Sequence, residues 1–144
     1  MIADDKQEVF NMMRVFYDSP ALIHKSSDKV LNNDIEACLS DNPYLDGYVF
    51  LCDGNIAGYS MVSKSFTTEY GGICGWIEDI YIKDDYRRKG IARMFFEELP
   101  KMYPEIVRFK LEVEPENERA ISTYRSCDYT ALEYGIMEQV RVQD

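Results

Sequence analysis

Arg87-Arg88-Lys89-Gly90-Ile91-Ala92-Arg93 is the stretch of this sequence that decides most about the fold. It follows a strand-like run at residues 76–82 (WIEDIYI). It also opens a run in which apolar residues recur at helical spacing, namely Ile91, Met94, Phe95 and Leu99. The pattern therefore predicts a strand, a basic glycine turn and a helix in succession.

The cations of this turn stand at the expected helix N-terminus, in a chain whose formal net charge is -10. Backbone N–H groups are unpaired there and the macrodipole is positive, so each cation loses roughly 0.3–1 kcal/mol. Glu97 and Glu98, in what the sequence marks as the last turn, also have the wrong sign for the dipole. Phosphate oxygens bound at the first turn would explain this charge pattern. A turn whose cations are merely solvated is the alternative, because short glycine motifs recur by chance.

Composition bounds the class of protein. A chain of 144 residues with 46% hydrophobic and 29% charged residues suits one packed α/β or α+β domain, spanning residues 1–144. The four cysteines are scattered and only one histidine is present, so we expect reduced thiols and no metal site. No signal-like segment or long apolar run occurs, which predicts a cytoplasmic protein without a membrane partner. The acidity argues against nucleic acid and favours a cationic substrate.

Hydrophobic periodicity gives the remaining elements. Helices are predicted at residues 6–17, 28–39 and 117–126. Strands are predicted at residues 48–52, 56–62, 107–113 and 129–140, and Asp53-Gly54-Asn55 is a hairpin signal. This order predicts a mixed sheet with helices packed on it.

The central stretch also resembles a known family. Residues 77–93 are similar to motif A of the GNAT superfamily of acetyl-CoA-dependent N-acetyltransferases, whose signature is Arg/Gln-x-x-Gly-x-Gly/Ala. Its defined positions correspond to Arg87, Gly90 and Ala92. Downstream, Leu111-Glu112-Val113 followed by Asn117, Ala120 and Tyr124 resembles motif B, and the whole resemblance covers residues 48 to 135. It implies a GNAT-like three-layer α/β fold with a mostly antiparallel mixed sheet of about six strands.

Two features depart from the family pattern. Asp128-Tyr129 stands where the family usually has Gly-Phe or Gly-Tyr, so aspartate must make that turn. Residues 1–5 leave almost no room for the β-strand that usually precedes the first helix, and we expect it to be lacking or truncated.

The resemblance implies acetyl-CoA as cosubstrate, without a metal. Backbone amides of the Gly90 turn would bind the pyrophosphate, and the strand before the turn would hydrogen-bond the pantetheine amides through its backbone. The residues expected at this site are Ile80, Tyr81, Ile82, Arg87, Arg88, Lys89, Gly90, Ile91, Ala92, Arg93, Asn117 and Tyr124. For Asn117, helix capping alone is the alternative.

Amine acetylation needs a base, because an alkyl amine of pKa near 10.4 is deprotonated at pH 7 in only about one molecule in 2,500. Glu78 is the candidate, since its strand parity with Trp76, Ile80 and Ile82 predicts a carboxylate on an apolar face with a raised pKa. Asp79 is a second candidate, and a water chain or an ordinary rim carboxylate is the alternative.

The resemblance makes Tyr124 the acid that protonates the leaving thiolate, and it places Tyr17 and His24 with Glu78 at the acceptor pocket. The implied reaction is direct acetyl transfer to a primary amine in a ternary complex, with a small cationic acceptor favoured. A protein or peptide amine and a non-catalytic CoA sensor are the alternatives, and a homodimer is left open.

Overall fold

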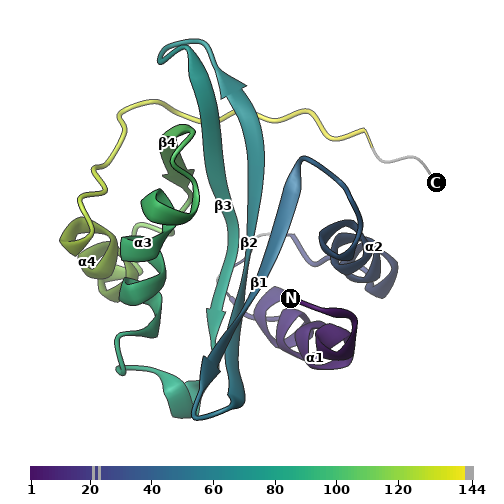
Figure 1. Ribbon diagram of the computed structural model, residues 1–144. Helices are drawn as coiled ribbons and strands as arrows, with labels where there is room; N and C mark the ends of the chain where they lie inside the picture. The colour runs from purple at the N-terminus through teal and green to yellow at the C-terminus, as the bar shows by residue number, and fades with distance from the viewer. Residues whose placement is uncertain (21, 23, 142–144) are drawn as a thin grey trace.

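The computed structural model describes residues 1–20, 22 and 24–141. A four-stranded sheet of order β1-β2-β3-β4 forms the middle layer, with α1 and α2 on one face and α3 and α4 on the other (Figure 1). The helices are α1 (Lys6–Tyr17), α2 (Asp28–Leu39), α3 (Ile91–Met102) and α4 (Glu118–Ser126). The strands are β1 (Leu45–Cys52), β2 (Asn55–Thr67), β3 (Gly72–Ile82) and β4 (Ile106–Leu111). The predicted three-layer α/β fold is confirmed, with four strands in the described part of the chain in place of about six.

The sheet changes direction at its last strand. β1, β2 and β3 form an antiparallel meander, and the predicted β1–β2 hairpin is confirmed, with Gly54 at φ 79°. β4 runs parallel to β3, and their pairing ends at Ile77 and Leu111. From Glu78 onward, that edge of β3 has no strand partner among the described residues. The second half of β3 therefore presents free backbone groups between the layers.

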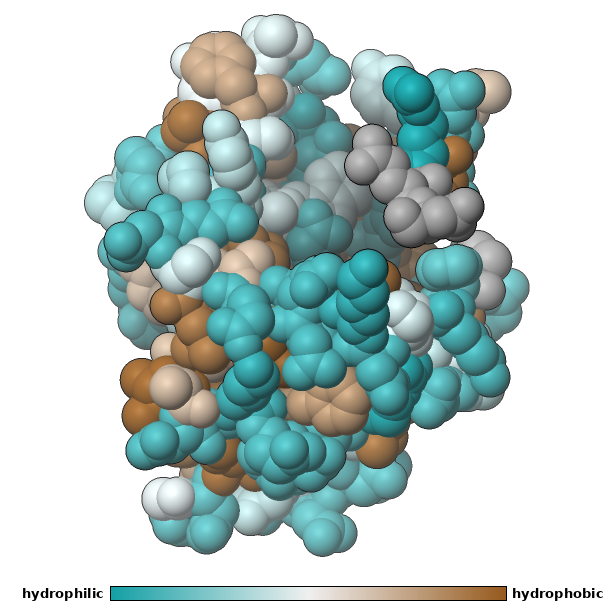
Figure 2. All heavy atoms as spheres, turned by 90° about the vertical axis from the view of Figure 1, so that its right-hand side faces the viewer, coloured by the Kyte–Doolittle hydropathy of each residue, from teal (hydrophilic) through white to brown (hydrophobic). Residues whose placement is uncertain are grey.

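Apolar stripes attach the helices to the two faces of the sheet. Val9, Met12 and Met13 of α1 are buried against the β2 side of the sheet together with α2 residues. On the other face, Phe95, Phe96 and Leu99 of α3 pack on Val62 and Ile77. Hydrophilic side chains dominate the outer surface of α1 and α2 (Figure 2). The helical period thus separates a buried stripe from a solvated one.

Two local expectations from the sequence are wrong. Residues 130–141 form neither helix nor strand, so the strand predicted at 129–140 is not formed. α3 continues past Pro100 to Met102, which places Lys101 in its last turn and moves Glu97 and Glu98 to the helix interior. The charge argument therefore holds only for the first turn. As expected, the described residues before α1 contribute no strand, and a short 3₁₀ turn at Ala3–Asp5 takes that place.

None of the helices in the described ranges is both long and apolar enough to cross a membrane.

Candidate functional site

A cleft of about 910 Å³ opens where the free half of β3 meets the N-termini of α3 and α4. One wall is the end of β3 and the turn that follows it, from Ile80 to Ala92. The facing wall is α4, and the C-terminal end of α1 with Pro20 borders the opening. The cleft exists because β3 and β4 separate beyond Ile77 and no described strand fills the gap.

The glycine turn leaves the first turn of α3 open. Gly90 is the N-cap residue in the left-handed conformation, at φ 76°, and no side chain caps the helix. A Cβ built on Gly90 would meet no heavy atom within 4 Å. The orphan N–H groups of Ile91, Ala92 and Arg93 are thus available to an external acceptor.

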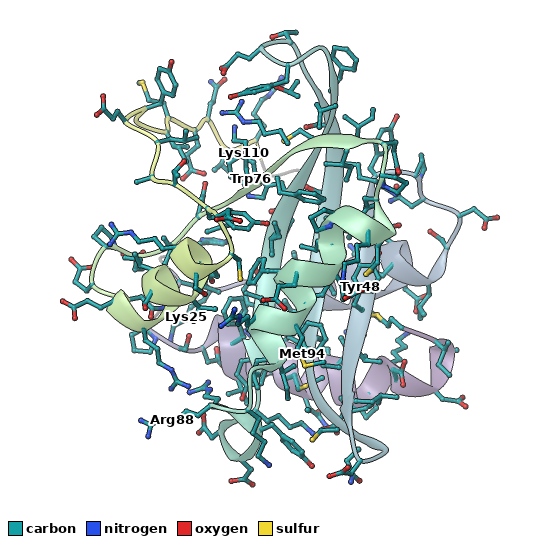
Figure 3. The ribbon with its side chains drawn as sticks, turned by 60° about the vertical axis from the view of Figure 1, so that its left-hand side comes forward. Lys25, Tyr48, Trp76, Arg88, Met94 and Lys110 are labelled. Carbon is teal, nitrogen blue, oxygen red and sulfur yellow. The ribbon has the colours of Figure 1, made fainter. Side chains whose placement is uncertain are left out.

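The cations of the turn divide into tethered and free groups. The Arg87 Nε donates to the carbonyl oxygen of Ile82 at 2.9 Å, and its guanidinium pairs with Asp84 at 2.7 Å, so Arg87 braces the turn. Arg93 pairs with Glu97 at 2.8 Å along α3. Arg88, at φ 63°, has no ion pair in the described part of the chain and projects outward below α3 (Figure 3). Arg88 is therefore a cation of this turn that lines the cleft without an ion-pair partner among the described residues.

α4 contributes a cap and a phenol. The Asn117 side chain accepts a hydrogen bond from the Ala120 N–H at 3.2 Å, so it caps the helix. Tyr124, two turns further on, also lines the cleft, and its ring meets Phe96 edge to face at 5.2 Å. Burial raises the pKa of the Tyr124 phenol, which keeps it protonated as a potential acid.

The sequence predicted that Glu78 lies on an apolar face, and this prediction is wrong. A β-bulge pairs Met61 with Asp79 and Val62 with Ile77, which leaves Glu78 as the extra residue. The strict alternation along β3 is broken there, so Glu78 is exposed and its Oε1 accepts a hydrogen bond from the Ser63 hydroxyl at 2.5 Å. Glu78 is therefore an accessible carboxylate at the point where β3 becomes unpaired, not one in an apolar setting.

Asp79 is the buried carboxylate instead, with 4% of its surface exposed. Its two oxygens accept hydrogen bonds from the Tyr17 hydroxyl at 3.0 Å and the Tyr59 hydroxyl at 2.9 Å. Burial raises the pKa of Asp79 to about 6, and the two tyrosine hydrogen bonds oppose that rise. Asp79 thereby fixes the end of α1 beside the bulge.

A third carboxylate belongs to the same neighbourhood. Burial, followed by the negative charge of Glu78, raises the pKa of Asp34 on α2 to about 6. Asp34 and Glu78 also act in the same direction on Asp79. None of the three forms an ion pair with a cation among the residues that the structure describes, so the region around the bulge is electronegative.

The structure brings together most of the residues expected to bind the cosubstrate. Eleven of the twelve line the cleft, namely Ile80, Tyr81, Ile82, Arg87, Arg88, Gly90, Ile91, Ala92, Arg93, Asn117 and Tyr124. Lys89 is not among the lining residues, and its ammonium lies 5.1 Å from the Tyr86 ring centroid.

The three acceptor candidates lie outside that cleft. Tyr17 is held beside the bulge by Asp79, and Glu78 is at the bulge itself. His24 is exposed, and no described contact brings it to either.

Sequence reasoning missed Arg119 and Phe16, which also line the cleft. Arg119 stands two residues after the predicted cap of α4, and a search for cations in the first turn would have found it. Phe16 comes from α1 and gave no signal, because only the tertiary fold brings α1 to this wall.

Comparison with known proteins identifies the family. The model of the acetyltransferase (GNAT) family matches residues 7–129, and the chain belongs to that family.

A curated relative of the chain is also an acetyltransferase. The chain is 30% identical over 104 residues to a thialysine N-epsilon-acetyltransferase of Caenorhabditis elegans, covering 71% of this chain and 61% of the relative. The chain thus spans about 61% of that curated relative's length.

Solved structures show the same fold. A possible acetyltransferase from Clostridium difficile 630 superposes with a TM-score of 0.81 at 23% identity, covering 97% of this chain and 93% of the other. AAC(6')-Iy in complex with the bisubstrate analogue CoA-S-monomethyl-acetylneamine gives a TM-score of 0.78 at 15% identity, covering 99% and 95%.

Proposed function

We propose that this protein transfers an acetyl group from acetyl-CoA directly to a primary amine in a ternary complex. The observation that carries the proposal is the cleft itself. It joins an uncapped helix N-terminus, a strand edge without a partner and a half-buried phenol in one space. Family membership supports the same reaction class.

The residues of the cleft fit CoA. The N–H groups of Ile91, Ala92 and Arg93 face the opening at Gly90 and suit a pyrophosphate, with Arg88 adding free positive charge. Residues 80–82 pair with β2 on one side only, so the backbone groups on their other edge can serve the pantetheine amides, apart from the Ile82 carbonyl that Arg87 occupies. When bound, acetyl-CoA supplies an activated thioester. The chain's own residues position it and handle the protons.

Glu78 takes the proton that the attacking amine must lose. Deprotonating an alkyl amine at pH 7 costs about 4.6 kcal/mol, so a base at this point has a large effect. Glu78 is exposed, ionisable and located where β3 loses its partner, which makes it reachable by an incoming amine. It acts directly or through a water molecule, and Asp79 supports it by holding Tyr17 in place.

Tyr124 donates a proton to the departing thiolate. A thiol of pKa near 8.5 requires only about 2 kcal/mol of help at pH 7, so this step is the easier one. The raised pKa of the Tyr124 phenol keeps its proton available near neutral pH.

The acceptor is a small cationic amine. Asp34, Glu78 and Asp79 make the region around the bulge electronegative, and the chain as a whole carries a net charge of -10. Attraction of a cation would raise its local concentration around the bulge. The names of the thialysine and acetylneamine proteins point to amine acceptors as well.

The test is mass spectrometry of a pooled set of diamines, aminoglycosides, amino acids and short peptides after incubation with protein and acetyl-CoA. We expect a mass gain of one acetyl group on a polycationic member, absent without protein. Acetylation of peptides alone would favour a protein amine as acceptor. CoA binding without any acetylated product would favour a non-catalytic CoA sensor.

A further inference from the structure

The cleft between β3, α3 and α4 is positively charged, although the protein as a whole is acidic. Asp84 is the one carboxylate among the described residues of its lining, which also holds four arginines, namely Arg87, Arg88, Arg93 and Arg119. The whole chain carries a formal net charge of -10. A surplus of positive charge in a cleft of such a chain indicates a ligand with several negative charges.

Two of these arginines are already paired with carboxylates, Arg87 at 2.7 Å and Arg93 at 2.8 Å. Arg119 is exposed and forms no ion pair among the described residues, although Glu118 precedes it in the first turn of α4. A cation in the first turn of a helix is also opposed by the macrodipole. Arg119 therefore lines the cleft with an uncompensated charge, as Arg88 does on the facing wall.

The position of Arg119 along α4 relates it to the phosphate end of CoA. In the proposed complex, Tyr124 lies at the thiol end and the open start of α3 at Gly90 takes the pyrophosphate. Arg119 precedes Tyr124 on α4 by five residues, or about 7.5 Å along the helix axis. Because the N-termini of α3 and α4 both border the cleft, we place Arg119 towards the phosphates and away from the thiol.

CoA carries two separate anionic groups, the pyrophosphate and a phosphate monoester on the 3′-oxygen of its ribose. The N–H groups that follow Gly90 suit the pyrophosphate, and Arg88 belongs to the same turn. The start of α4 is less suited to an anion, because the Asn117 side chain already accepts from the Ala120 N–H at 3.2 Å. What α4 offers is the Arg119 guanidinium, whose planar fork matches the oxygens of a phosphate monoester.

We propose that Arg119 binds the 3′-phosphate of CoA, and that this contact makes the cleft select CoA over donors without that phosphate. Such donors include 3′-dephospho-CoA, which shares the pyrophosphate and the reactive thiol. The proposal rests on the proposed function, since it adds one contact to the same cosubstrate. Arg119 acts on the affinity for the donor and takes no part in the proton transfers.

Calorimetric titration with CoA and with 3′-dephospho-CoA tests the assignment. We expect the wild type to bind CoA about tenfold more tightly than 3′-dephospho-CoA, since one charged contact separates the two ligands. Arg119→Met should lower the affinity for CoA by a similar factor and leave the affinity for 3′-dephospho-CoA unchanged. Arg88→Met should weaken both ligands equally, because both carry the pyrophosphate.

Arg125 provides the matched control on the same helix. It is exposed, as Arg119 is, and it does not line the cleft. Arg125→Met should leave both affinities unchanged, and circular dichroism of each variant checks that the fold is kept.

Two results would overturn the assignment and still leave the cleft as a CoA site. These are equal affinity of the wild type for the two ligands, and an equal loss of affinity for both in Arg119→Met. A preference for CoA that disappears in Arg88→Met would give the 3′-phosphate to Arg88 instead. A wild type that binds neither ligand would contradict the proposed function as well.

Discussion

Glu78 and Asp79 are neighbours in the sequence, yet the bulge gives them opposite environments. Glu78 is exposed and bonded to Ser63, whereas Asp79 is buried between two tyrosine hydroxyls. A raised pKa would make Asp79 the stronger base, but its oxygens are both engaged and only 4% of its surface is exposed. Because Glu78 is accessible, it is the better candidate for removing the proton. Asp79 is buried, and its role is to hold Tyr17.

The free-energy costs of the two proton transfers predict which of two variants loses more activity. Glu78→Gln keeps the side chain's shape but removes its basicity, and we expect kcat at pH 7 to fall about 100-fold or more. Tyr124→Phe should lower kcat only about tenfold, since the thiolate needs less help. Steady-state kinetics with the identified amine measures both.

Glu105 is an exposed carboxylate outside the cleft. Glu105→Gln is therefore the matched control for Glu78→Gln, and it should leave kcat unchanged. If Tyr124→Phe proved the more damaging change, Glu78 would be a structural residue and a water relay would take the proton.

At the scale of elements, the cleft is built from three segment ends: the free end of β3 and the first turns of α3 and α4. The two helices begin differently. Gly90 leaves the start of α3 open, whereas Asn117 caps α4 with its own side chain. An open end suits phosphate oxygens, and a capped end suits a neutral part of the cosubstrate.

Substitution of two helix-capping residues tests whether Asn117 has a role beyond capping α4. Ser27 caps α2 through the Val30 N–H and does not line the cleft, so Ser27→Ala is the control for Asn117→Ala. Each change should lower the free energy of unfolding by about 1 kcal/mol, measured by urea denaturation. Only Asn117→Ala should also weaken CoA binding. Equal CoA affinity in the two variants would make Asn117 a cap and nothing more.

Element prediction from sequence succeeded where periodicity and caps agreed. The bounds of α1 and α2 were predicted correctly because each has a clear apolar stripe, and α2 also begins at a serine cap. The bulge at Glu78 could not be predicted, since it depends on pairing with β2 rather than on β3 alone. The strand at 129–140 was predicted wrongly, because a strand pattern specifies a strand only when an edge pairs with it.

At the scale of the whole molecule, the sequence largely predicted which residues line the cleft proposed for acetyl-CoA. It did not predict the surroundings of the residues proposed to bind the amine. The former comes from one contiguous motif, so eleven of its twelve predicted residues line one cleft. The latter combines Tyr17 of α1, Asp34 of α2 and Glu78 of β3, which only the three-layer packing brings near one another. The proposed acceptor site therefore depends on distant segments whose individual sequence signals are weak.

Calorimetric titration of CoA into three proteins tests the central claim most directly. Gly90 and Gly54 both have positive φ and open space at Cβ, so glutamate at either position causes similar backbone strain, about 1 kcal/mol. We predict that the wild type and Gly54→Glu bind CoA equally, and that Gly90→Glu binds at least tenfold more weakly because its carboxylate meets the phosphates. Unchanged affinity in Gly90→Glu, or no binding by the wild type, would contradict the assignment of this cleft to acetyl-CoA.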